Sequence, residues 1–156
     1  AAPRRGQARS ADNATYRGLL ADWLRERGVE DPAPTLSQLW RVDLDGDARD
    51  EVLLAATRHR GSATSVAAGD YSVLLLRRLV DDGEVLTLPV MEEVYTEECI
   101  AECALSRHEL FGVLDVDGDG RLEIISRSTG YESMGQAIHA VTQDGVSSML
   151  QWHCGA

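Results

Sequence analysis

The sequence contains the same acidic pattern twice, about 72 residues apart, at residues 43–51 and 115–123. In each copy Asp occupies the first, third and fifth positions, Gly the fourth and Glu the ninth. Because apolar, β-prone residues lie on both sides of each copy, each is predicted to join two β-strands. A repeat of this length indicates two copies of one structural unit rather than two unrelated turns.

Each unit is predicted to contain four strands, because apolar residues recur with the period of two that a half-buried strand requires. The expected fold class is mainly β, with two repeated four-stranded antiparallel units at about 36–95 and 109–154. We expect these units to form a sandwich or two blade-like sheets. Residues 81–84 and 143–145 are predicted hairpin turns. The predicted strands are residues 39–42, 52–57, 71–79, 85–95, 110–114, 122–126, 136–142 and 146–153.

One amphipathic helix is predicted before the first unit, at residues 14–27. Its apolar residues recur at intervals of three and four, which places them on one face of a helix. Asn13 or Asp12 can cap its start, and Gly28 can end it in the left-handed conformation. Residues 1–12 are predicted to be a disordered tail, and residues 13–156 a single β domain. The apolar face consists of Tyr16, Leu19, Leu20, Trp23 and Leu24.

The acidic pattern supplies oxygen atoms at alternate residues, which suits Ca²⁺. This ion takes about six to eight oxygen ligands at ~2.3–2.6 Å, whereas Mg²⁺ prefers to keep several waters. The loops are not EF-hands, because their flanks are β-type and their twelfth positions are Leu54 and Ser126 rather than Glu. The predicted ligands are Asp43, Asp45, Asp47, the Arg49 carbonyl and Glu51 in the first loop, and Asp115, Asp117, Asp119, the Arg121 carbonyl and Glu123 in the second.

Residues 115–125, Asp-Val-Asp-Gly-Asp-Gly-Arg-Leu-Glu-Ile-Ile, resemble the calcium loop of FG-GAP/VCBS-type repeats, best known from integrin-like β-propellers. Residues 43–53 resemble it with one departure, Ala48 in place of glycine, which can cost about 1 kcal/mol where a left-handed backbone is needed. The resemblance implies one or two calcium ions, β-sheet structure and an extracellular location: secreted, periplasmic or at the cell surface. A closed propeller needs ~4–8 blades, so two units do not form one.

The charge of the chain bears on its partners. The formal net charge is −11, with 26 acidic residues against 15 Arg and no Lys, which we attribute to the codon usage of a high-GC bacterial genome. No basic stripe is present, which argues against nucleic acid. No apolar run approaches the ~18 residues of a membrane span. A protein or carbohydrate ligand stays open, as does the oligomeric state.

Three cysteines, Cys99, Cys103 and Cys154, allow at most one intrachain disulfide. Cys99 and Cys103 are the closest pair, whereas pairing either with Cys154 would attach the C-terminal strand. Together with His108 and His153 these cysteines fit the spacing of structural zinc sites poorly, so a disulfide in an oxidising compartment is favoured. The start of the chain, without Met, fits a mature exported form. Residues 96–108 could hold a short helical turn.

No nucleophile elbow, zinc-protease motif or phosphate loop occurs, so no catalytic residues are predicted. Residues 59–68 and 128–135 are predicted to be equivalent connections that could face a ligand. The expected function is a calcium-binding, exported β-repeat module with a structural, binding or envelope-associated role. The alternatives are a metal-assisted hydrolase and an inhibitor or assembly subunit that uses an exposed sheet edge.

Overall fold

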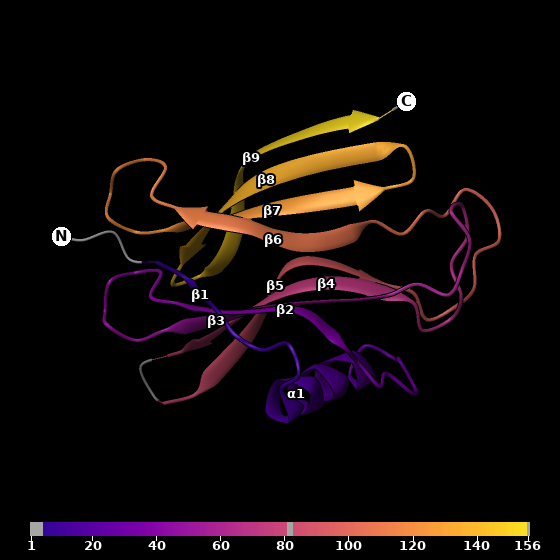
Figure 1. Ribbon diagram of the computed structural model, residues 1–156, viewed down its shortest axis with the longest axis horizontal. Coiled ribbons are helices and arrows are strands. Elements are labelled where there is room, and N and C mark those ends of the chain that lie inside the picture. The colour runs from indigo at the N-terminus through magenta and orange to yellow at the C-terminus, as the bar shows by residue number, and fades with distance from the viewer. Residues whose placement is uncertain (1–4, 81–82, 156) are drawn as a thin grey trace.

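The computed structural model describes residues 5–80 and 83–155, which form one helix and two antiparallel sheets (Figure 1). The first sheet has the strand order β1-β2-β3-β4-β5 and the second β6-β7-β8-β9. The predicted fold class, mainly β with two four-stranded units and an N-terminal helix, is confirmed. The elements are β1 (Gln7–Ala8), α1 (Ala14–Arg25), β2 (Leu36–Val42), β3 (Glu51–Arg58), β4 (Tyr71–Leu79), β5 (Val85–Val94), β6 (Arg107–Leu114), β7 (Glu123–Gly130), β8 (Ser133–Thr142) and β9 (Gly145–Gly155).

The three layers are α1, the first sheet and the second sheet, in that order (Figure 1). One apolar cluster lies between α1 and the first sheet and includes Leu20, Leu24 and Leu75. Another joins the two sheets and includes Leu74 and Ile124. Strands β3 and β4 are thus covered on both faces, so they contain continuous apolar runs instead of alternating ones. The second sheet is covered on one face only.

The helix prediction is confirmed, with an end two residues earlier than expected. The side chain of Asn13 accepts the backbone N–H of Tyr16 at 3.2 Å and caps the start of α1. Gly28 has φ +88°, the left-handed conformation that reverses the chain after a helix. Trp23 is buried against the sheet, and the Arg27 guanidinium lies 3.3 Å from its ring centroid.

The predicted connection at residues 128–135 is wrong. Strand β7 continues to Gly130 and β8 begins at Ser133, so only Tyr131 and Glu132 form the turn. Pairing with both β6 and β8 holds Ser128 and its neighbours in a strand, although Ser, Thr and Gly are typical of loops. The first unit does have a long connection after β3, which extends to the start of β4 at Tyr71.

Two further expectations need correction. Gln7 and Ala8 pair with Arg41 and Trp40 of β2, so this part of the predicted disordered tail is a short strand. Residues 96–106 contain no helical turn; instead, Cys99 forms an isolated antiparallel bridge with Val66. Residues 1–4 of the tail, and residues 81–82 of the predicted hairpin turn, lie outside the described residues.

The disulfide joins Cys99 and Cys103, and Cys154 is exposed with a free thiol. The two bonded cysteines therefore are not zinc ligands. The bridge to Val66 attaches their segment to the long connection of the first unit. Among residues 5–80 and 83–155, no helix is long and apolar enough to cross a membrane.

Candidate metal centres at one end of the two sheets

The two acidic loops join equivalent strands of the two units, β2 to β3 and β6 to β7. Both emerge at the same end of the stacked sheets, on the left in Figure 1. The repeat in the sequence therefore corresponds to a repeat in space. The loops have a common environment because the sheets are packed face to face.

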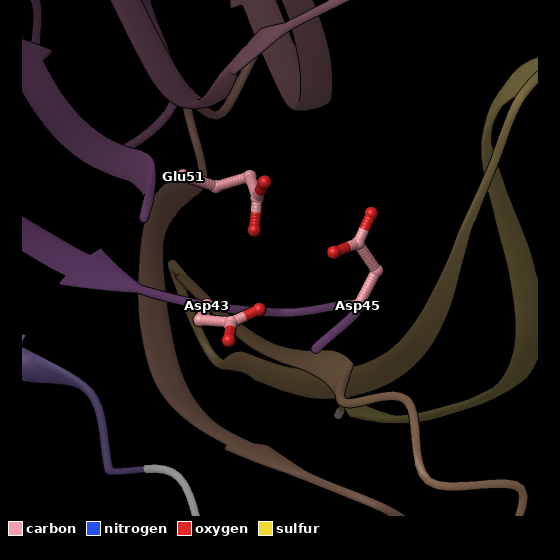
Figure 2. A group of neighbouring side chains, drawn as sticks. All are labelled: Asp43, Asp45 and Glu51. Atoms are coloured by element: carbon pink, nitrogen blue, oxygen red, sulfur yellow. The ribbon is translucent and has the colours of Figure 1, made fainter. Parts of the chain in front are cut away.

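In the first loop, Asp43, Asp45 and Glu51 turn their carboxylates toward one another (Figure 2). One oxygen from each residue lies within 4.8 Å of the others, close enough to hold one metal ion. Asp43 follows the end of β2, and Glu51 is the buried first residue of β3. The strand ends therefore position two of the three carboxylates. Asp47 lies outside this group.

Backbone N–H groups hold these carboxylates in place. The two oxygens of Asp43 accept the N–H groups of Gly46 at 2.6 Å and Ala48 at 3.2 Å. Glu51 Oε2 accepts the N–H of Leu44 at 2.7 Å, across the loop. The backbone of the loop thus folds around its own acidic side chains.

The second loop repeats this arrangement bond by bond. Asp115 accepts the N–H groups of Gly118 at 2.7 Å and Gly120 at 3.0 Å, and Glu123 accepts that of Val116 at 2.8 Å. Its metal-binding group is Asp115, Asp117 and Glu123, again with one oxygen of each within 4.8 Å of the others. The two loops have the same geometry despite different residues at several positions.

Asp47 and Asp119 each hold a turn of their own loop. Each is outside the metal-binding groups, and its Oδ1 accepts the backbone N–H two residues later, Arg49 or Arg121, at 2.7 Å. These bonds close a turn in the second half of each loop. Ligation by Asp47, Asp119 and the two Arg carbonyls stays a prediction.

At position 48 the backbone adopts a conformation that favours glycine, but the first loop has alanine there. Its φ is +66°, in the left-handed region, and the equivalent Gly120 has φ +88°. A side chain with a Cβ is strained in this region by about 1 kcal/mol or more. The first loop therefore adopts the same backbone as the second at a greater conformational cost.

The electrostatics of the first loop favour a cation. Burial raises the pKa of Glu51, and the carboxylates of Asp45 and Asp47 raise it further, although the N–H of Leu44 acts in the opposite direction. Burial is the larger cause, and the two neighbouring carboxylates add negative charge that a bound cation would offset. Hard carboxylate oxygens are the donors that Ca²⁺ and Mg²⁺ prefer. The residues thus fit a hard divalent cation.

A cavity of about 250 Å³ lies between the two loops. Carboxylates from both loops line it, Asp45 and Glu51 from the first and Asp117 and Glu123 from the second. Arg78 also lines it, and its guanidinium donates to the carbonyl oxygens of Thr142 at 2.6 Å and Gln143 at 2.8 Å. The two candidate metal centres are therefore neighbours on one cavity.

A polar network that was not predicted from the sequence lies between the sheets. His108 Nδ1 lies 2.9 Å from Ser128 Oγ and its Nε2 lies 3.1 Å from Glu93 Oε1. A Ser–His–carboxylate chain can activate a nucleophile, but the histidine must also reach the leaving group. His108 is only 4% exposed, and its backbone N–H is bonded to Ser72 Oγ at 2.8 Å, so the network joins the sheets. No spacing in the sequence signals it.

No family model, no curated protein and no solved structure matches this chain. Its class is therefore defined by its own fold and site. It is a mainly β protein of two packed antiparallel sheets with one disulfide. Each sheet carries an acidic loop that can hold a metal ion at the same end of the molecule.

Proposed function

We propose that this protein is an exported β-repeat module of the FG-GAP/VCBS type that is stabilised by calcium at both acidic loops. The observation that carries the proposal is the repeated geometry of Asp43, Asp45 and Glu51 in Asp115, Asp117 and Glu123. Two loops of unequal sequence have the same carboxylate positions and the same backbone bonds. An acidic turn that only faced solvent would not require the carboxylates to keep the same positions in both loops.

Calcium fits these loops better than magnesium because of the number of oxygen donors that each loop can supply. Three carboxylates converge in each loop, and a second carboxylate oxygen, a backbone carbonyl or water can add further ligands. Ca²⁺ accepts six to eight such oxygens in irregular geometry, whereas Mg²⁺ demands near-ideal octahedral geometry and retains waters. We assign the stronger site to residues 115–123, because the first loop contains the strained Ala48.

The role of the ions is structural. An ion bound only by the folded chain stabilises it by RT ln(1 + [Ca²⁺]/Kd), which is about 2.7 kcal/mol per site at 100 times Kd. Each ion would connect the end of one strand to the start of the next and neutralise buried charge at Glu51 or Glu123. The module would then present its surface to a protein or carbohydrate partner.

Two features support export. Disulfides such as Cys99–Cys103 persist in oxidising compartments. Weak calcium sites are filled outside cells, where extracellular modules bind with Kd of about 10⁻⁴–10⁻³ M. A secreted, periplasmic or cell-surface location accounts for both.

The test is thermal unfolding in EDTA, in millimolar Ca²⁺ and in millimolar Mg²⁺, with calorimetry to count the ions. We expect Ca²⁺ to raise Tm well above the EDTA value and Mg²⁺ to raise it less. Asp117→Asn should remove one ion, and Asp144→Asn, in the exposed turn between β8 and β9, is the matched control. An equal Tm in EDTA and Ca²⁺, with no heat of binding, would refute the proposal.

A further inference from the structure

The two sheets have four edge strands, β1, β5, β6 and β9, and three of these edges are protected. An unprotected edge presents unpaired N–H and C=O groups that pair with another strand. Strand β1 is only two residues long. Strand β5 contains Pro89, which has no N–H to donate, and Glu92 and Glu93, whose charges oppose pairing.

The edge of β6 is protected by side chains of the first sheet. Gln38 Oε1 accepts the backbone N–H of Leu110 at 2.8 Å, and Gln38 Nε2 donates to the Leu110 carbonyl at 3.0 Å. Ser72 Oγ accepts the backbone N–H of His108 at 2.8 Å. These backbone groups of β6 are therefore satisfied within the molecule.

Within residues 5–80 and 83–155, none of these protections is found over the second half of β9. A register shift places Met149 opposite no residue of β8 and divides the strand there. Before Met149, Val146 packs against the apolar cluster between the sheets. After it, residues 150–155 are exposed and lie at the open edge, with Leu150 62% and Trp152 47% exposed.

The same strand is free of ionic charge. No Asp, Glu, Lys or Arg occurs in residues 145–155, in a chain whose formal net charge is −11. Edge strands are usually blunted by charged residues. Because β9 lacks charged residues, another acidic molecule can approach this edge without bringing like charges into contact.

We propose that a second copy of this chain pairs antiparallel with residues 150–155, so that two four-stranded sheets become one eight-stranded sheet. An antiparallel strand pair about a two-fold axis is self-complementary, which is the commonest symmetry of oligomers. Gln136 and Ile138, the β8 partners of Trp152 and Leu150, alternate with buried residues, so Trp152 and Leu150 lie on the outer face. Both copies would place these side chains side by side across the new pair.

A second copy suits this edge better than an unrelated strand. Its edge is equally neutral and carries the same apolar row, so the two rows match without adaptation. The charge of −11 on each copy opposes approach at long range, and salt screens that repulsion. Pairing of two copies should therefore strengthen as the salt concentration rises.

Cys154 must be removed for the test, because its exposed free thiol would link two chains covalently. We would use Cys154→Ser without reductant, which leaves the Cys99–Cys103 disulfide intact. Sedimentation velocity over a hundredfold concentration range, in constant Ca²⁺, should show a reversible monomer–dimer equilibrium. Raising NaCl from 20 to about 150 mM shortens the Debye length several-fold, and the dimer fraction should increase.

The variants test the edge itself. Gln151→Lys should weaken the dimer at least tenfold, because each copy would bring a positive charge into the new strand pair. Gln151→Glu should do the same, and a mixture of the two variants should restore dimerisation through opposite charges. Gln136→Lys, the same change one strand inward on β8, should leave the dimer unchanged. Circular dichroism and Tm establish that each variant is folded.

Three outcomes would overturn the proposal. In the first, the Cys154→Ser protein stays monomeric at every concentration and salt level, even if it binds an added foreign strand. The second is a dimer weakened equally by Gln136→Lys and Gln151→Lys. The third is a mixture of folded Gln151→Lys and Gln151→Glu proteins that does not associate.

Discussion

The backbone N–H of Leu122 donates to the carbonyl oxygen of Leu44 at 2.8 Å, and this bond connects the two acidic loops. Leu44 lies between Asp43 and Asp45, and Leu122 directly precedes Glu123. The loops are thus in direct contact as well as being equivalent in the repeat. Changes in one loop are expected to affect residues that position carboxylates in the other.

Glu51→Gln should change stability in opposite directions with and without calcium. Burial and neighbouring carboxylates raise the pKa of Glu51, so its charge is unfavourable when no cation is bound. The amide oxygen of Gln can still accept the Leu44 N–H. We expect an equal or higher Tm in EDTA and a smaller rise in Tm when Ca²⁺ is added. Glu123→Gln in the second loop is the companion variant; a lower Tm for Glu51→Gln in EDTA would contradict this account.

Exchanging the residues at the left-handed position should change the ranking of the two loops. Ala48→Gly removes strain at φ +66° and should stabilise the protein by about 1 kcal/mol, or roughly 2–4 °C in Tm. Gly120→Ala should destabilise it by a similar amount, although its Cβ would meet open space. Urea unfolding measures both. Equal stabilities for the two variants and the wild type would show that the left-handed residue is not costly.

Among the acidic residues outside the loops, Asp70 is expected to stabilise the fold most. Its side chain is fully buried and accepts the backbone N–H groups of Arg60, Gly61 and Ala67 at 2.9–3.2 Å. Burial raises the pKa of Asp70, but these hydrogen bonds outweigh it and hold the pKa below its usual value. Asp70→Ala should cost about 2–3 kcal/mol in urea unfolding, because buried donors lose an ionised acceptor.

The exposed Asp144→Ala is the control for this prediction, since it removes a carboxylate of the same charge from a hairpin turn. Its effect should stay within about 0.5 kcal/mol, as for most surface substitutions. A similar loss for both variants would mean that net charge, rather than the Asp70 hydrogen bonds, determines the result.

His139 should make the protein less stable as the solution becomes acidic. His139 is 4% exposed, with Nε2 2.8 Å from Ser126 Oγ, and burial lowers its pKa below the usual value of a histidine. The unfolded chain then binds a proton at a higher pH than the folded chain does. The stability from neutral His139 is present above about pH 6.5 and is lost as pH falls toward the lower folded pKa.

Urea unfolding between pH 5 and 8 measures this dependence, and His139→Gln should flatten it. The exposed His59→Gln is the control and should leave the slope unchanged. A slope that persists in His139→Gln would assign the pH dependence to other groups.

Local patterns predicted the parts of this structure that depend on neighbouring residues. The bounds of β4 were correct, because Tyr71–Leu79 is a run of β-prone residues between clear breaks. The carboxylate groups were found from their spacing, since a nine-residue loop determines which side chains face inward. Asp47 and Asp119 lie outside these groups, and each accepts the backbone N–H two residues later.

Features that depend on residues far apart in the chain were not predictable in this way. The contacts of His108 with Ser128 and Glu93 join three strands, and only the packing of the sheets brings these residues together. The same is true of the shared cavity, to which residues 45 and 117 contribute from different sheets. Composition also misled, because Ser128 has low strand propensity but lies in β7, where it pairs with both β6 and β8.

The two bonds of Gln38 help to align the two sheets. Apolar contacts are not directional, so two apolar sheet faces can slide or rotate on each other with little change in free energy. The amide of Gln38 uses one N–H and its oxygen to bond the backbone of Leu110, and so acts as a single peptide unit of an additional strand. With the bonds of His108 to Ser72 and of Leu122 to Leu44, it restricts the translation and angle of one sheet on the other.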